Sequence, residues 1–269
     1  TDNQIDSTLV SNSVLYMGTD YGAAAFDLTK QALIWYQPAS ASTAFQFRNI
    51  LLQSGMLYLQ PTMPDNTLYV FNTQDGKQIW AYDPLNINKQ DFSDPFHISL
   101  TSDAHIYAHN SSVVRALNPL TGAVIWETNY LHWTNNDAIK QMVVSNNGIF
   151  FITGPGGGDI LALNQQDGSK LWYMPSTDVY SSLAVGQNHV YALGAQTLYA
   201  LNIHTGTLLW QKSNISNNMQ TSTTQNDLYL VDTNPYNADT TSNAINLDPG
   251  TGKTLWSIQN INVISSTLP

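Results

Sequence analysis

The stretch LYALNIHTGTLLW, residues 198–210, recurs along the chain and decides its fold. It contains two apolar-rich segments joined by a polar turn, and it ends on a tryptophan. Similar stretches end at five other tryptophans, which are Trp35, Trp80, Trp126, Trp172 and Trp256. Six copies in one register indicate a repeat protein, because self-similarity at a fixed period is the signature of repeat architectures.

The turn of each copy has a constant chemistry. Asn or Asp stands eight residues before the tryptophan, after a bulky apolar residue, and glycine stands four before it in five copies. Gln31 takes the place of that glycine in the first copy. Asn and Asp bond to their own backbone in tight turns, and glycine accepts positive φ without steric cost. Each copy is therefore predicted to be a β-hairpin.

The six tryptophans of the repeat are predicted to be structural. Along the second strand Leu209 points opposite to Trp210, because side chains alternate between the faces of a sheet. An indole is too large for one small sheet to bury, so we expect each tryptophan to pack against the neighbouring repeat. Its N–H group then needs an acceptor there.

The period selects the architecture. Successive repeat tryptophans lie 38 to 46 residues apart. A period of roughly 40–50 residues with several short strands is typical of a β-propeller, and the helical apolar spacing of a solenoid is absent. About 45 residues per repeat fits four strands per blade. The sequence thus predicts an all-β fold, a β-propeller of six four-stranded blades.

The repeat resembles the PQQ-type, or quinoprotein-like, propeller repeat, whose motif is Ala-Leu-Asp/Asn-x-x-Thr-Gly-x-x-x-Trp. The resemblance covers essentially the whole chain. Proteins with this repeat include dehydrogenases that use pyrroloquinoline quinone, a lipoprotein scaffold of the outer-membrane β-barrel assembly machinery, and sensor domains of receptor-like kinases. The fold alone does not choose among these functions.

We expect one domain over residues 1–269, with a tail at the seam of the ring. The predicted blades cover about residues 1–36, 43–81, 95–127, 138–173, 178–211 and 218–257, and the tail covers 258–269. The tail sequence NVISSTLP resembles an inner strand, so three outcomes are open: six closed blades with the tail packed across the seam, strand exchange, or a part of a larger ring. Six blades are preferred, since an open arc leaves an unprotected sheet edge.

The composition excludes several classes of partner. Only 10% of the residues are charged, the net charge is −10 and the isoelectric point is about 4.6. Nucleic acid is excluded because its phosphates require clustered Lys and Arg, and an anionic membrane surface is disfavoured for the same reason. The absence of cysteine removes disulfides, thiolate metal sites and cysteine nucleophiles.

A polar surface made of Asn, Gln, Ser and Thr favours an extracytoplasmic location. No apolar run approaches the roughly 18 residues of a membrane span, so no membrane insertion is expected. The chain begins at Thr1 without Met and without a signal peptide. We therefore expect that any targeting segment is missing from this chain, which would be a monomeric part of a larger one.

The loops after the repeat tryptophans are the predicted site of binding, on what we call the top face. One of them contains Trp133, which alone among the seven tryptophans lies outside the repeat register. With Tyr130 and His132 beside it, Trp133 is predicted to form an aromatic wall. The alternative is that this loop folds back over the blade edge and buries its own aromatic side chains.

Other polar residues are expected nearer the propeller axis. Arg48 and Lys140 stand at the starts of inner strands. A polar funnel is predicted from five residues, which are Arg48, His97, Lys140, Tyr180 and Gln220. The ligand or partner of the top face stays open between a small molecule, a glycan and a protein.

Several other features receive structural interpretations. Arg115 replaces an uncharged residue of the repeat and is expected to be desolvated and to form a structural pair within blades three and four. His105 and His109 are too far apart on one strand to share a metal comfortably, although a site with His97 is conceivable. Residues 232–243 are oxygen-rich, but Tyr236 breaks the calcium-loop spacing. Residues 154–159 lack the Lys and the helix of a phosphate loop.

The predicted function is non-catalytic binding, with no catalytic residue, metal or cofactor. One alternative is a hydrolase or lyase centred on His97 with Asp91 or Asp94. A quinoprotein dehydrogenase is less favoured. Its resemblance implies a chain about twice as long, an adjacent-cysteine disulfide and an acidic calcium site, and this chain has no cysteine.

Overall fold

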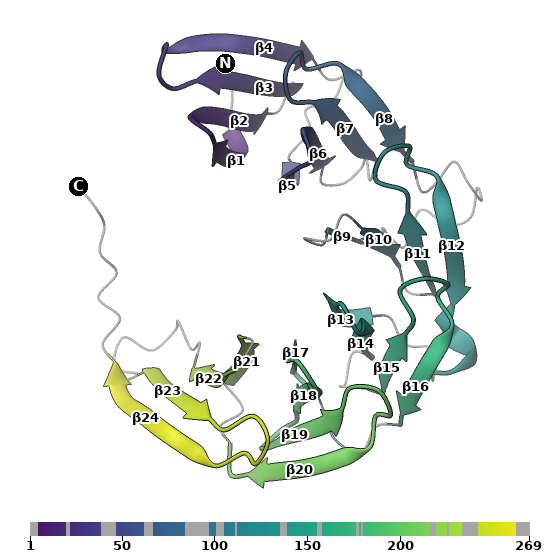
Figure 1. The fold of residues 1–269 in the computed structure, drawn as a ribbon, viewed down its shortest axis with the longest axis vertical. Coiled ribbons are helices and arrows are strands. Elements are labelled where there is room, and N and C mark those ends of the chain that lie inside the picture. The colour runs from purple at the N-terminus through teal and green to yellow at the C-terminus, as the bar shows by residue number, and fades with distance from the viewer. Residues whose placement is uncertain are drawn as a thin grey trace. The chain divides into compact units, whose positions relative to one another are not determined.

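The computed structural model describes residues 5–19, 22–38, 47–61, 67–83, 97–100, 105–110, 112–134, 139–154, 158–175, 178, 180–215, 219–224, 226–232 and 242–261. These residues form six four-stranded antiparallel sheets and one 3-10 helix (Figure 1). Within every sheet, strands that follow each other in sequence are neighbours. The predicted all-β propeller with six four-stranded blades is confirmed.

The chain divides into two compact units, and the first comprises Thr1–Asn110 and Val114–Glu127. It holds the first two sheets and most of the third. The first sheet consists of β1 (Ile5–Ser11), β2 (Val14–Thr19), β3 (Gly22–Asp27) and β4 (Ala32–Pro38). The second consists of β5 (Phe47–Gln53), β6 (Met56–Pro61), β7 (Leu68–Asn72) and β8 (Gln78–Tyr82). The third consists of β9 (His97–Leu100), β10 (Ile106–His109), β11 (Val113–Leu117) and β12 (Val124–Asn129).

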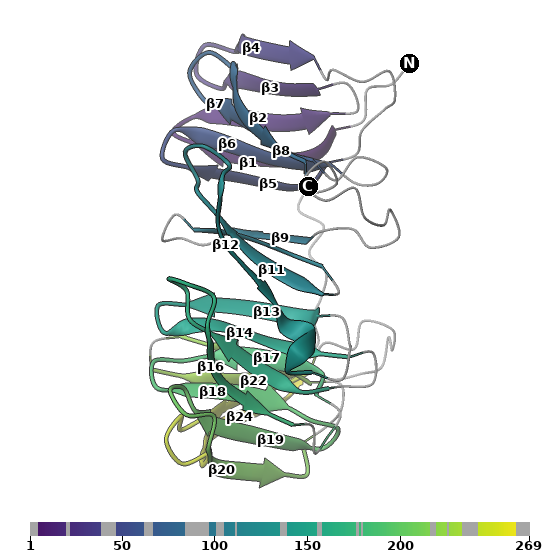
Figure 2. The same ribbon diagram turned by 90° about the vertical axis from the view of Figure 1, so that its right-hand side faces the viewer.

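The second unit comprises Ser111–Val113 and Thr128–Pro269, and it begins with the short helix η1 (Tyr130–His132). The fourth sheet consists of β13 (Ile139–Ser145), β14 (Gly148–Thr153), β15 (Ile160–Leu163) and β16 (Lys170–Met174). The fifth consists of β17 (Ser182–Val185), β18 (His189–Leu193), β19 (Thr197–Asn202) and β20 (Leu208–Ser213). The sixth consists of β21 (Met219–Thr223), β22 (Leu228–Asp232), β23 (Ser242–Leu247) and β24 (Thr254–Ile261), and Figure 2 shows these sheets from the side.

The end of the last blade differs from the sequence prediction. Strand β24 continues to Ile261, so residues 258–261 belong to the sixth sheet and not to a tail. Residues 262–269, on which the prediction of a seam-packing tail rests, lie outside the described residues.

The hairpin turns follow the chemistry that the repeat predicts. In the fifth sheet the Oδ1 atom of Asn202 accepts hydrogen bonds from the backbone N–H groups of His204 (2.9 Å) and Thr205 (3.1 Å). Gly206 then adopts a φ of 68°. In the first sheet Gln31 adopts the same left-handed region, with a φ of 53°. The turn is therefore kept even where the glycine is missing, at a conformational cost to the side chain.

A β-bulge precedes the tryptophan of each repeat whose register is known. In the fifth sheet Ala200 pairs with Trp210 and Leu201 with Leu208, so Leu209 is the extra residue. The bulged residues of the other sheets are Ile34, Ile79, Leu171 and Leu255. A bulge increases the local twist of its strand and re-aims the next side chain. Here the next side chain is the repeat tryptophan.

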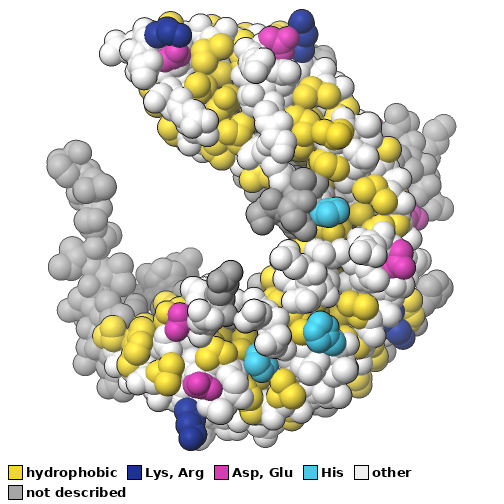
Figure 3. Space-filling model, viewed as in Figure 1, with side chains coloured by type: hydrophobic (Ala, Val, Ile, Leu, Met, Phe, Trp, Pro, Cys, Tyr) yellow, Lys and Arg dark blue, Asp and Glu magenta, His cyan; other side chains and the backbone are white. Residues whose placement is uncertain are grey.

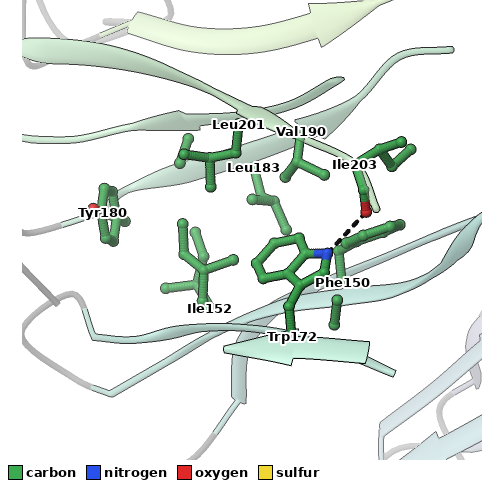
Figure 4. Packing of buried hydrophobic residues seen from close by; sticks show 11 residues of the cluster. Phe150, Ile152, Trp172, Tyr180, Leu183, Val190, Leu201 and Ile203 are labelled. Carbon is green, nitrogen blue, oxygen red and sulfur yellow. Dashed lines mark hydrogen bonds between the residues drawn. The ribbon is translucent and has the colours of Figure 1, made fainter. Parts of the chain in front are cut away.

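Within each unit the core lies between successive sheets, and buried repeat tryptophans are central to it, whereas Trp256 of the sixth sheet is 44% exposed. Figure 4 shows Trp172 of the fourth sheet among Leu183, Val190 and Leu201 of the fifth, and its Nε1 donates to the carbonyl oxygen of Ile203 at 2.8 Å. Equivalent bonds join Trp35 to Thr73 (2.9 Å), Trp80 to Pro119 (3.0 Å) and Trp210 to Pro249 (3.1 Å). The indole thus finds its acceptor in the next repeat, as its chemistry requires.

Candidate functional site

The loop that carries Trp133 is held by local hydrogen bonds. The Oδ1 atom of Asn129 accepts the N–H of Leu131 at 3.0 Å and so caps the helix η1. The N–H of Tyr130 donates to the carbonyl oxygen of Ser112 at 3.1 Å, and the N–H of Trp133 donates to that of Tyr130 at 3.0 Å. The backbone around Trp133 therefore has a defined conformation.

The two described aromatic side chains of this loop have different surroundings. Tyr130 is fully buried, and its ring meets the edge of Phe151 with 5.3 Å between centroids. Trp133 is only partly buried, and the Nζ of Lys170 lies 5.2 Å from its ring centroid, over the edge strand β16. Such a cation–π contact contributes about 0.5–1 kcal/mol at an exposed site. Tyr130 thus anchors the loop, while Trp133 remains accessible. The side chain of His132 lies outside the described residues.

The five residues of the predicted funnel are only partly brought together. Lys140 is exposed and its Nζ donates to the carbonyl oxygen of Tyr180 at 3.0 Å, which links β13 to the segment before β17. Tyr180 itself is fully buried against Tyr199, with ring centroids 5.6 Å apart. Gln220 is exposed on β21. Arg48 and His97 lie on β5 and β9, and their side chains are outside the described part of the chain. Binding by these residues stays a prediction.

Arg115 forms a structural pair within the third blade, as predicted, but its second hydrogen-bond partner lies in the second blade and not in the fourth. Its Nε donates to Glu127 Oε2 at 2.6 Å, and its Nη1 donates to the hydroxyl of Tyr82 at 2.9 Å. Desolvation opposes the charge, but the two hydrogen bonds outweigh it and raise the pKa of Arg115. Because Tyr82 comes from β8 and the other two from β11 and β12, this cluster joins the second and third sheets.

The described parts of the histidine cluster and of the two polar loops form no recognisable metal or phosphate site. The register places His97 opposite His109, while the His105 ring stacks on Tyr107 at 6.1 Å. Among the residues that the structure describes, no group of three or more His, Cys, Asp or Glu side chains has metal-binding geometry. Most of residues 232–243 and all of residues 155–157 lie outside the described part of the chain. The backbone N–H of Thr153 donates to the backbone carbonyl oxygen of Asp159 at 3.0 Å and closes the turn between β14 and β15.

Two polar side-chain contacts of the second unit, one between strands β13 and β17 and one in a loop, were not predicted from the sequence. The side-chain amide of Gln141 clasps the backbone of Leu183, donating to its carbonyl oxygen at 3.1 Å and accepting its N–H at 2.7 Å. The carboxylate of Asp178 accepts the Tyr199 hydroxyl at 3.0 Å and the Ala195 N–H at 3.2 Å. Both fix one segment of the chain to another, and neither residue lies in the repeat motif that the sequence makes visible.

The described residues contain no helix long and apolar enough to cross a membrane. On the face shown in Figure 3, charged side chains are few, and some of them lie in adjacent pairs of opposite charge among apolar and uncharged polar ones. This agrees with the low charge content of the sequence.

Comparison with known proteins gives matches over most of the chain. The chain is similar to a protein of Rickettsia conorii, RC0314, with 24% identity over 172 residues that cover 60% of this chain and only 40% of that protein. BamB from Moraxella catarrhalis has a similar structure, with a TM-score of 0.59, 15% identity and coverage of 92% of this chain and 73% of that one. Quinohemoprotein alcohol dehydrogenase from Comamonas testosteroni has a TM-score of 0.61, 12% identity and coverage of 96% and 61%.

The structural likenesses show the fold alone, because fold similarity at such identities does not transfer function. The family comparison is more specific. A family described as "Outer membrane protein assembly factor BamB" matches residues 6–156 and 110–262, which together span nearly all of the described sheets. The chain therefore belongs to this family of PQQ-like repeat propellers.

Proposed function

We propose that this chain is a non-catalytic binding domain of a larger extracytoplasmic bacterial protein, and that the loop carrying Trp133 contacts its partner. The observation that carries the proposal is the accessible indole of Trp133 on a loop anchored by the buried Tyr130. Rigid, accessible tryptophans are enriched among the residues that dominate binding energy at protein interfaces. No packing requirement of the repeat explains a tryptophan at this position.

The family supports a scaffold role outside the cytoplasm. Its description names an outer membrane protein assembly factor. A surface with few charges and many uncharged polar side chains agrees with the same location. The partner class stays open between a protein, a glycan and a small molecule, and the proposal assigns the chain no catalytic step.

The small-ligand form of the proposal is tested by a thermal-shift screen. The purified chain is heated with amino acids, cell-wall and plant oligosaccharides, calcium and pyrroloquinoline quinone. A ligand at a hundredfold its dissociation constant stabilises the fold by about 2.7 kcal/mol. In a chain of this size that raises the midpoint by several degrees. The shift is expected to vanish in Trp133→Ala and to persist in Leu120→Ala, which changes an exposed hairpin residue. A shift that survives Trp133→Ala would place the site elsewhere.

A further inference from the structure

A small groove lies between the fifth and sixth sheets, away from the loop of Trp133. It has a volume of about 180 Å³, and it is lined by the turn between β17 and β18, the turn between β21 and β22, and Pro249. We call it the turn groove. Its polar wall consists of six side chains, which are Gln187, Asn188, His189, Thr224, Asn226 and Asp227.

Two of these residues occupy the same position of the repeat, which is apolar in some sheets and polar in others. His189 pairs with the conserved turn residue Asn202, and Val14 and Met56 occupy the same place opposite Asp27 and Asn72. Asp227 precedes Leu228, which pairs with Leu247, so it stands at the corresponding position of the sixth sheet. His105 fills the same position in the third sheet and stacks on Tyr107 as His189 stacks on Tyr191, so a stacked histidine there is a feature of the fold. A carboxylate at this position, Asp227, occurs only in the sixth sheet.

The carboxylate of the groove is held in place. Asp227 Oδ2 accepts the hydroxyl of Thr224 at 3.1 Å, and its Oδ1 accepts the Nδ2 of Asn246 at 3.3 Å. Asn246 is 3% exposed and lies behind Asp227 on β23. A carboxylate with a fixed orientation and remaining acceptor capacity is suited to receive donors from a ligand.

The histidine of the groove is also held, and it is uncharged at neutral pH. Its imidazole stacks on Tyr191 with 5.6 Å between centroids, and the hydroxyl of Tyr191 donates to the carbonyl oxygen of Pro249 at 3.1 Å. Desolvation lowers the pKa of His189, although the negative charge of Asp248 acts in the opposite direction. A neutral imidazole offers one donor and one acceptor.

Charge and size restrict the ligand. No Lys or Arg lines the turn groove and one carboxylate does, so an anion is disfavoured. Since a water takes about 30 Å³ in the liquid, the groove has room for about six waters, far less than the roughly 300–1,000 Å³ of a drug-sized pocket. The amide, hydroxyl, imidazole and carboxylate groups of the lining include both donors and acceptors, which match a ligand rich in hydroxyl groups.

We propose that the turn groove is a binding site for one unit of a neutral, hydroxyl-rich ligand of the size of a monosaccharide. Asp227 accepts hydroxyl protons, His189 both donates and accepts, and the exposed amides of Gln187, Asn188 and Asn226 close the rim. This site is independent of the one proposed around Trp133.

The test is an NMR titration of the ¹⁵N-labelled chain with glucose, N-acetylglucosamine and myo-inositol, and separately with calcium chloride and sodium phosphate. At least one of the three polyols is expected to cause saturable shifts in residues 186–189 and 224–227. The substitution Asp227→Asn removes the carboxylate, and Asn226→Trp fills the groove from an exposed position. Each should weaken binding at least tenfold. Asp167→Asn and Asn146→Trp, the same changes in exposed turns of the fourth sheet, should not.

The thermal midpoint of each variant shows whether it is folded. If Asp227→Asn does not fold, Asn226→Trp still tests the proposal. The absence of saturable shifts with all three polyols would overturn the proposal. Polyol binding of unchanged affinity in both Asp227→Asn and Asn226→Trp would also overturn the proposal. Saturation by calcium or phosphate alone would assign the turn groove to an ion and would also contradict the inference.

Discussion

The indole N–H of Trp172 donates to the carbonyl oxygen of Ile203 at 2.8 Å, and the same ring covers Gly206, where an added Cβ would stand 2.5 Å from Cε3 (Figure 4). One repeat thus supplies the tryptophan. The next repeat supplies the carbonyl oxygen that accepts the indole N–H and the glycine whose missing side chain leaves room for the ring. The contacts of Trp35 with Gly76, Trp80 with Gly122 and Trp210 with Gly252 repeat this arrangement. Stability is therefore expected to depend on these junctions between sheets.

Gly206→Ala should destabilise the fifth sheet strongly. The φ of 68° disfavours a side chain, and the new methyl group would overlap the Trp172 ring. Left-handed strain of about 1–2 kcal/mol and overpacking of about 1–3 kcal/mol together predict a loss of about 2–5 kcal/mol in the free energy of unfolding. Urea denaturation measures it. Gly250→Ala is the control, because its nearest neighbour would be Asp248 Oδ1 at 3.6 Å. Equal losses in the two variants would contradict the account.

Trp172→Ala and Trp256→Ala should differ although both change the repeat tryptophan. Trp172 is 6% exposed, whereas Trp256 is 44% exposed. Truncation of a buried tryptophan costs about 3–5 kcal/mol, and the cost falls with the apolar area that was buried. We expect the Trp256 variant to lose clearly less, as measured by chemical denaturation of both. A larger loss in Trp256→Ala would show that its indole is covered in solution.

Tyr82→Phe should weaken the junction between the second and third sheets. The phenol accepts a hydrogen bond from the guanidinium of Arg115, and a bond to a charged group contributes about 1.5–3 kcal/mol. The loss of unfolding free energy should be of that size. Tyr16→Phe is the matched control, because Tyr16 is also buried and its hydroxyl makes no hydrogen bond with the residues that the structure describes. A difference of less than about 0.5 kcal/mol between the two variants would refute the role of Tyr82.

Alkaline pH should unfold the chain through its buried tyrosines. Burial, with the nearby Asp159, raises the pKa of Tyr173 to about 12, and burial also raises the pKa values of Tyr58, Tyr82 and Tyr191. An unfolded tyrosine has a pKa near 10. The folded state thus holds the phenolic protons more tightly, and this stabilisation is complete below about pH 10 and is lost as pH rises through the higher folded values.

Absorbance titration of the phenolates measures this effect. A fraction of the tyrosines is expected to ionise late and together with the loss of native circular dichroism. If all tyrosines ionised near pH 10 while the native signal persisted, the burial of these hydroxyls would be wrong.

The repeat could be predicted because its determinants are local. The turn depends on residues within one hairpin, such as Asn202 and Gly206, and the need of an indole for an acceptor depends on its own chemistry. The bulge at Leu209 was not predicted. It lies in the unbroken apolar run of residues 208–210, where no change of pattern marks the extra residue.

The loops were less predictable because their contacts are long-range. Tyr130 and Trp133 are three residues apart and equally aromatic, yet one is buried against Phe151 and the other is accessible. That difference depends on where β14 and β16 lie. The Nζ of Lys140 donates to the carbonyl oxygen of Tyr180, which is 40 residues away in sequence, and no sequence pattern indicates this contact.

The proposed function is tested most directly by photo-crosslinking from the loop of Trp133. A benzoylphenylalanine is placed at Leu131, beside the intact Trp133, or at Leu120, an exposed residue of the β11–β12 turn. Each chain is irradiated in whole cells of the organism that produces it and then analysed by mass spectrometry. The account predicts one discrete adduct at position 131, absent at 120 and lost with Trp133→Ala. No adduct at 131, or equal adducts at both positions, would contradict a binding role for this loop.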